Sequence, residues 1–156
     1  ILERWNDEAL SIKPDVLCVL VGINEVWHKH KWNKPMTSKE FKDNYIQLLE
    51  RMKTSNPNIK ILLIEPFAFP IGAYESSWDS DLIEEQNIVK ELASTYANWY
   101  IPMQHIFNLY LQNHSMEEIL GDGVHPTQLG HQMIEKEVRK VLRSFIIDYY
   151  LEDTEK

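Results

Sequence analysis

The chain has 156 residues, a size that fits one domain with a buried core, and we expect a single domain over residues 1–156. Hydrophobic residues make up 44% of the sequence and aromatic residues 11%, which excludes a disordered chain. The net charge of −8 is scattered, so the basic stripe needed for nucleic-acid binding is absent. No apolar run is long enough to span a membrane. We expect a cytoplasmic protein, although a chain beginning at Ile1 leaves room for a preceding signal segment.

Apolar spacing predicts helices and strands in alternation. Residues 1–10 carry apolar side chains at helical spacing, and Lys13 with Pro14 ends that helix. Residues 16–21 form a continuous apolar run, which is typical of a strand buried on both faces. Cys18, the only cysteine, lies in this run and is expected to be a small buried side chain rather than a nucleophile. The chain then leaves the strand as a loop.

Thr37 and Glu40 form a predicted capping box, which opens a helix that ends at residues 56–58. The apolar stripe of this helix consists of Phe41, Tyr45, Leu48, Leu49 and Met52. The later elements, in chain order, are a strand over residues 59–64, a helix over 82–96, a strand over 99–101, a short helix over 106–111, a last helix over 128–147 and a frayed polar tail over 152–156.

This alternation predicts an α/β protein: a parallel sheet covered by helices on both faces, in a three-layer α/β/α fold wound like flavodoxin. Three strands make a narrow sheet, and the strand over residues 16–21 is too apolar for a comfortable exposed edge. It resembles an interior strand without its neighbours. Its open edge is where we expect any self-association of the chain.

The strongest functional signal is Asp-Gly-Val-His-Pro-Thr at residues 122–127, followed by Gly130 and His131. A carboxylate three residues before a histidine can accept a hydrogen bond from one imidazole nitrogen, which leaves the other nitrogen to take a proton. Asp122 and His125 are therefore a candidate acid–base pair. The alternative is that Asp122 caps a turn and His125 merely precedes a proline, and we expect His131 to be structural.

Loops at the carboxyl ends of parallel strands meet at one edge of the sheet, where α/β proteins build their sites. Asn24 follows the strand over residues 16–21, and the loop over residues 65–77 follows the second strand. We therefore expect Asn24 to face His125 as an amide donor. The alternative is that Asn24 is a left-handed turn residue.

Two other groups of side chains allow more than one interpretation. His28 and His30, with Glu25, lack a convincing third metal ligand, so we expect a solvated loop, no metal and no cofactor. Several aromatic residues fall on predicted loops at the same edge, where they line a pocket or pack the loops down. These residues are Trp27, Trp32, Phe67, Phe69 and Trp78.

Residues 21–27 (Val-Gly-Ile-Asn-Glu-Val-Trp), 63–66 (Leu-Ile-Glu-Pro) and 122–127 resemble the SGNH, or GDSL-like, serine hydrolases, which are α/β/α esterases and lipase/acylhydrolases. The order and spacing fit along nearly the whole chain. The resemblance implies ester hydrolysis through an acyl-enzyme, with His125 as the general base, Asp122 as its orienting carboxylate and Asn24 as an oxyanion donor. It implies no cofactor, and it favours acetyl esters on carbohydrate as substrates.

The sequence departs from this family pattern at the nucleophile. The family's serine lies in a Gly-Asp-Ser segment after the first strand, and a glycine after the second strand donates to the oxyanion; neither occurs in the sequence. We therefore expect the first two strands of the fold to be missing from this chain. Glu25 stands where the family usually has Asp. Two alternatives stay open: Ser76 or Ser77 replaces the nucleophile, or the chain is a non-catalytic member that binds without acylation.

Overall fold

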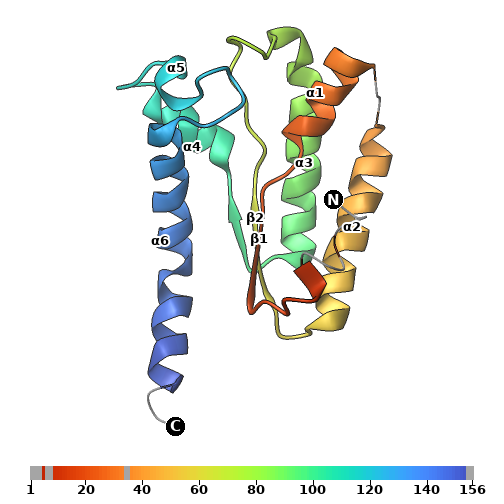
Figure 1. Cartoon of the computed structure of the whole chain (residues 1–156), viewed down its shortest axis with the longest axis vertical. Helices are drawn as coiled ribbons and strands as arrows, with labels where there is room; N and C mark the ends of the chain where they lie inside the picture. The colour runs from red at the N-terminus through yellow and green to blue at the C-terminus, as the bar shows by residue number, and fades with distance from the viewer. Residues whose placement is uncertain (1–4, 6–8, 34–35, 154–156) are drawn as a thin grey trace.

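A computed structural model describes residues 5, 9–33 and 36–153, and the helix expected over residues 1–10 lies largely outside these residues. The elements, in chain order, are β1 (Val16–Val19), α1 (Ile23–Trp32), α2 (Ser38–Ser55), β2 (Lys60–Ile64), the 3-10 turn η2 (Ser76–Trp78), α3 (Asp79–Tyr96), β3 (Trp99–Ile101), α4 (Met103–Tyr110), α5 (Met116–Ile119) and α6 (Gln128–Asp153) (Figure 1).

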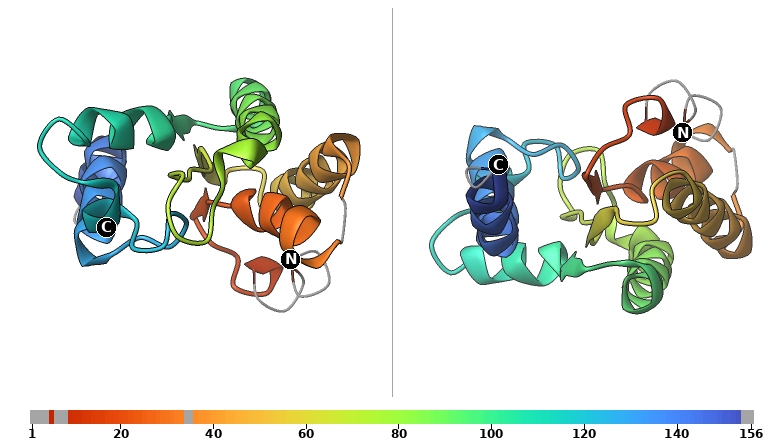
Figure 2. Two further views of the ribbon diagram at one scale, coloured as in Figure 1. Left: turned by 90° about the horizontal axis from the view of Figure 1, so that it is seen from above. Right: turned by 90° about the horizontal axis from the view of Figure 1, so that it is seen from below.

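The described strands form one parallel sheet with the order β1-β2-β3. Helices α2 and α3 pack on one face, and α4 and α6 pack on the other, as Figure 2 shows from above and below. The predicted α/β fold with a parallel sheet is therefore confirmed. The segments that follow the three strands lie at the upper edge of the sheet in Figure 1.

The central strand β2 builds both halves of the core because successive side chains point to opposite faces. Ile61 and Leu63 pack against α2 and α3, and Leu62 and Ile64 pack against α4 and α6. All four side chains are buried. A third buried cluster lies at the loop edge of the sheet, where it joins α1 and the start of α3 to the later loops. Its members are Val26, Ala68, Tyr74, Trp78, Leu82 and Val124.

The capping box that opens α2 is confirmed. Thr37 Oγ1 accepts a hydrogen bond from Glu40 N at 3.1 Å, and Thr37 N donates to Glu40 Oε2 at 2.8 Å. The predicted stripe of α2 is buried along its whole length. A second capping box, formed by Ser115 and Glu118, opens α5. This helix is not among the elements predicted from the sequence.

The loop predicted after β1 is wrong, because the chain enters α1 immediately after Gly22. Ile23, Val26 and Trp27 are spaced at i, i+3 and i+4, so they share the helix face that packs into the third cluster. The expected solvated loop around His28 and His30 is the second half of this helix. Ile83, an apolar residue of α3, is 53% exposed.

The prediction that Cys18 is buried is also wrong: Cys18 is exposed, and Leu20 is 39% exposed. Leu17 and Val19 pack into the core beside α2 and α3, so Cys18 points to the opposite face. The core on that face draws on β2 and β3 but not on β1. Among the described residues, helices therefore cover β1 on one face only. Of the helices described, none is long and apolar enough to cross a membrane.

Because Leu62 and Leu63 are fully buried on opposite faces of β2, we expect each leucine-to-alanine substitution to lower the free energy of unfolding by about 3 kcal/mol. Ile83→Ala, at an exposed position, should change it by less than about 1 kcal/mol. Urea unfolding followed by circular dichroism measures all three. Equal losses for Ile83→Ala and the two strand variants would contradict the two-faced core.

Candidate active site

The Asp122 carboxylate organises the loop that carries His125. Asp122 Oδ1 accepts hydrogen bonds from the backbone N–H groups of Val124 and His125, at 3.0 and 2.8 Å. Asp122 Oδ2 lies 2.8 Å from His125 Nδ1, which donates to it when the proton is on that nitrogen. One carboxylate thus fixes both the turn and the imidazole ring. The predicted pairing of Asp122 with His125 is present.

The charge of Asp122 follows from these contacts. Partial burial raises the pKa of its carboxyl group, but hydrogen bonds from the backbone and side chain of His125, and from the Val124 backbone, outweigh this effect and lower the pKa to about 2. Asp122 therefore stays ionised at neutral pH, and its negative charge faces Nδ1 of His125.

The other ring nitrogen, Nε2, has no hydrogen-bond partner among the described residues, and the His125 side chain is 68% exposed.

The loop after β2 is joined to the Asp122 loop by backbone hydrogen bonds. Phe69 N donates to Gly123 O, and Ala73 N donates to Asp122 O, each at 2.8 Å. Gly123 has φ +88°, and a Cβ there would lie 2.3 Å from Ile71 O. The two backbones approach so closely that only glycine fits at Gly123.

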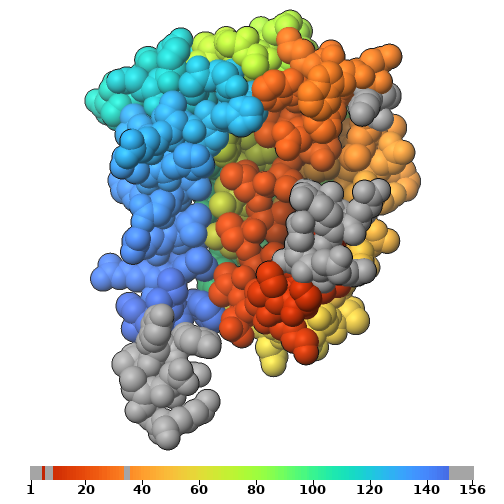
Figure 3. All heavy atoms as spheres, in the orientation of Figure 1, coloured from red at the N-terminus to blue at the C-terminus, as the bar shows by residue number. Residues whose placement is uncertain are grey.

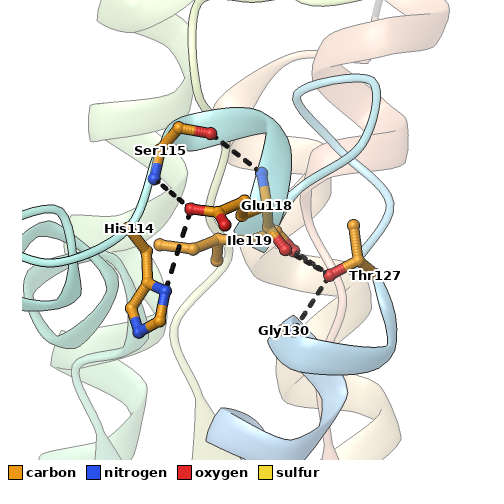
Figure 4. Close-up of polar contacts among 6 residues, drawn as sticks. All are labelled: His114, Ser115, Glu118, Ile119, Thr127 and Gly130. Carbon is orange, nitrogen blue, oxygen red and sulfur yellow. Dashed lines mark hydrogen bonds and ion pairs between the residues drawn. The ribbon is translucent and has the colours of Figure 1, made fainter.

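Thr127 joins the start of α6 to the end of α5 (Figure 4). Its hydroxyl donates to the carbonyl oxygens of Glu118 and Ile119 and accepts from Gly130 N at 3.2 Å. A Cβ on Gly130 would lie 2.3 Å from Ile119 O, so this glycine permits the helix to pack against the α5 backbone. The Thr-x-x-Gly part of the sequence motif is therefore structural, and it fixes where the His125 loop ends.

Asn24 lies in the first turn of α1 and is exposed. Trp27 follows it by three residues, so the two side chains project from the same face of the helix. The Trp27 ring lies 5.5 Å from the His125 ring, measured between centroids. The expected approach of the Asn24 side-chain amide to His125 stays a prediction. The contact between Trp27 and His125 has no local signal in the sequence, because it depends on α1, which replaces the loop expected after β1.

The remaining side chains singled out in the sequence mostly pack loops. Phe67, Phe69 and Trp78 are buried, and Trp32 is 60% exposed. Ser76 and Ser77 are exposed in the turn η2. Within the described part of the chain, no group of three or more histidine, cysteine or acidic side chains is arranged to hold a metal ion.

His30 stacks on the Trp78 ring at 4.9 Å, and its Nε2 lies 2.7 Å from Asp81 Oδ2. Lys29 Nζ donates to the other oxygen of Asp81, also at 2.7 Å. These contacts fasten the second half of α1 to the start of α3. His30 thus has structural partners.

A histidine hydrogen-bonded to a carboxylate at the loop edge of a parallel α/β sheet lies where such folds place their ligand sites. The sequence matches the model of the GDSL-like lipase/acylhydrolase family over residues 1–133. The chain belongs to this family, and the predicted resemblance is confirmed.

Individual relatives agree with this assignment. The acetylxylan esterase of Geobacillus stearothermophilus is 25% identical over 133 residues, which cover 84% of this chain and 60% of that protein. A putative GDSL-like lipase from Parabacteroides merdae superposes with a TM-score of 0.85 at 28% identity, covering 89% of this chain and 65% of that one. The crystal structure of the Geobacillus esterase gives a TM-score of 0.76 at 23% identity, with 89% and 64% covered, and shows the shared fold. This chain thus spans less than two thirds of each relative.

We expect Gly123→Ala to destabilise the Asp122 loop by at least about 2 kcal/mol, because the added methyl group meets backbone oxygens at a positive φ. Gly121→Ala is the matched control, since a Cβ there meets only the Thr127 methyl group at 3.6 Å. Urea unfolding compares the two variants. A loss no larger for Gly123→Ala than for Gly121→Ala would refute the close approach of the two loops.

The lowered pKa of Asp122 predicts a pH-dependent contribution to stability. A carboxyl group whose pKa is lower in the folded state stabilises the fold above its unfolded pKa, and loses that contribution as the pH falls through the folded value. We therefore expect the stability difference between the wild type and Asp122→Asn to shrink as the pH falls from about 4 to about 2. Denaturant titrations at several pH values measure it, with Asp15→Asn as the control. A difference independent of pH would contradict the hydrogen-bonded carboxylate.

Proposed function

We propose that the protein hydrolyses carboxylic esters through a covalent acyl-serine, with His125 as the general base, Asp122 as its orienting group and Asn24 as an oxyanion donor. The observation that carries this proposal is the 2.8 Å contact of His125 Nδ1 with Asp122 Oδ2, which leaves Nε2 without a partner in the described chain and open to solvent. An imidazole held in this way is suited to accept a proton from a nucleophile.

In the first half of the reaction, the serine hydroxyl oxygen attacks the ester carbonyl carbon and its proton passes to His125 Nε2. The carbonyl oxygen becomes an oxyanion, which the Asn24 side-chain N–H stabilises. The tetrahedral intermediate collapses, and the departing alcohol takes the proton from Nε2. A water molecule then attacks the acyl-serine, with His125 again accepting and returning a proton, and the carboxylic acid leaves.

We place the nucleophilic serine outside residues 1–156. The Geobacillus esterase, which is longer than this chain, has been crystallised as serine-to-alanine and histidine-to-alanine forms that are described as catalytic mutants of that enzyme. Among the residues described here, no serine hydrogen-bonds to His125. In this proposal a serine from another part of the full-length protein supplies the attacking hydroxyl, and His125 accepts its proton.

As the substrate class we propose short acyl esters on carbohydrate, acetyl esters in particular. The name of the curated relative supports this choice, because that protein is an acetylxylan esterase. The half-buried Trp27 ring beside His125 supports it as well, since it offers a flat apolar surface next to the imidazole ring.

The second candidate is a non-catalytic member of the family that binds esters without cleaving them. The exposed positions of Ser76 and Ser77 and the lack of a described serine on His125 favour it for residues 1–156 alone. A fluorophosphonate probe separates the candidates. We expect stoichiometric labelling of the full-length protein and none of residues 1–156 alone. Labelling of residues 1–156 would overturn our placement of the serine, and absence of labelling in both would favour the non-catalytic member.

In the full-length protein we expect Asn24→Ala to lower kcat for an acetylated xylo-oligosaccharide by ~10²–10³, the effect of removing one oxyanion donor. His125→Ala should lower kcat by at least ~10⁴, because proton transfer from the serine is lost. His131→Ala, a histidine on α6 that we expect to be structural, is the control and should retain wild-type kcat. Steady-state assays of acetate release measure these effects, and unchanged activity in His125→Ala would refute the assignment.

A further inference from the structure

A glutamine in the first turn of α4 holds the loop that follows β2. Gln104 Oε1 accepts a hydrogen bond from the backbone N–H of Ala68 at 2.9 Å. Ala68 is buried, and a buried N–H group without an acceptor lowers stability markedly. The half-buried Gln104 side chain therefore supplies an acceptor that the observed path of the loop requires.

Gln104 is itself held by contacts on two sides. Its backbone N–H donates to Glu65 Oε2 at 3.0 Å, and the other oxygen of Glu65, the residue after β2, accepts from the Tyr100 hydroxyl at 2.8 Å. Its side-chain Nε2 donates to Asn108 Oδ1, one turn along α4, at 3.2 Å. The amide group therefore has a defined orientation, with its oxygen toward the loop and its nitrogen toward Asn108.

The segment that Gln104 holds is the one that meets the histidine loop. Phe69, the next residue after Ala68, donates its backbone N–H to Gly123 O at 2.8 Å. Gly123 adjoins Asp122, whose carboxylate accepts from the backbone and side chain of His125. Hydrogen bonds thus run without a break from α4, through two successive N–H groups of one short segment, to the loop that carries the imidazole.

Packing fixes this segment from one side only. The Phe69 ring lies 6.3 Å from the Phe107 ring of α4, measured between centroids. A cavity of about 260 Å³, lined in part by Ala68, Phe69 and Gln104, lies beside the same segment. Because no side chain fills this space, van der Waals contact does not determine the position of the segment on the cavity side. The hydrogen bond to Gln104 supplies that restraint.

A second glutamine holds the same loop at a different point. Gln86, on α3, donates from Nε2 to Pro66 O at 2.9 Å, which is the same length as the bond from Ala68 N to Gln104. Pro66 lies two residues before Ala68, so the peptide unit that Gln86 holds does not adjoin the N–H that meets Gly123. Gln86 is therefore a matched comparison: it stabilises the loop without lying between α4 and the histidine loop.

We propose that Gln104 is a positioning residue, which acts through residues 68–69 to set the place of the loop that carries His125. Without its amide oxygen, the segment shifts relative to α4, and the Asp122 loop shifts with it. A general base must lie within a fraction of an ångström of its productive position, so a small shift slows proton transfer. The effect on loop position is independent of the esterase activity; only its consequence for catalysis rests on the proposed function.

Hydrogen exchange followed by NMR in the full-length protein tests the loop position without catalysis. Gln104→Met keeps the length of the side chain and removes the acceptor. We expect exchange of the Phe69 and Val124 N–H groups to become about tenfold faster, the effect of one lost hydrogen bond on local opening. The Leu49 N–H of α2 should exchange as in the wild type, which shows that the change is local. Gln104→Glu keeps an acceptor oxygen and should restore slow exchange.

Three results would overturn the proposal. The first is unchanged exchange at Val124 in Gln104→Met, and the second is exchange in Gln104→Glu as fast as in Gln104→Met. The third is equal acceleration at Val124 in Gln86→Met, because the effect would then follow from loop stability in general rather than from the contact with Ala68.

Steady-state acetate release by the same full-length variants tests the catalytic consequence. We expect Gln104→Met to lower kcat by ~10–10² without changing KM, because a misplaced base slows the chemical steps but not substrate binding. Gln104→Glu should recover wild-type kcat. Gln86→Met should retain it, as should Gln112→Met, which makes the same substitution at an exposed position beyond α4. Equal losses in Gln104→Met and Gln86→Met would overturn the proposal. An inactive wild type would refute the proposed function instead, and the exchange rates would still decide the role of Gln104.

Discussion

The contact between the loop after β2 and the loop before α6 is the constraint on which the rest of the site depends. Phe69 and Ala73 donate backbone hydrogen bonds to Gly123 and Asp122, at a separation that a side chain on Gly123 would not allow. The Asp122 carboxylate then fixes His125 from a backbone that is itself fixed. Site geometry is in this way tied to the central strand of the sheet, because the first of the two loops continues β2 directly.

Much of this arrangement could be predicted from the sequence, and the failures have a common cause. Capping chemistry and apolar periodicity predict α2 and the three strands, because both signals are local. The Asp122–His125 pair is equally local, since its members are three residues apart. The predictions for Cys18 and for the start of α1 were wrong, because the surroundings of both depend on which faces of the sheet other elements cover. The Gly123 and Gln104 contacts join distant segments and leave no mark on a single sequence.

The same edge of the sheet holds carboxyl groups in opposite states. Asp122 receives three N–H contacts and stays ionised, with its pKa lowered to about 2. Glu85 has a buried oxygen without a partner among the described residues, and its pKa is raised to about 9. Hydrogen bonds from N–H donors keep Asp122 charged beside the imidazole, whereas burial and neighbouring acidic groups oppose the charge on Glu85.

The exposure of His125 has a consequence for how the pair works. In Figure 3 the segment around residues 120–130 lies at the molecular surface beside α1, and the imidazole is in contact with bulk water. Water screens the attraction between a protonated imidazole and Asp122, so their electrostatic interaction is weak while the surface is uncovered. Whatever covers the ring lowers the local dielectric and strengthens this interaction. The electrostatic interaction within the acid–base pair is therefore stronger when a ligand covers the imidazole ring than when the ring is exposed to water.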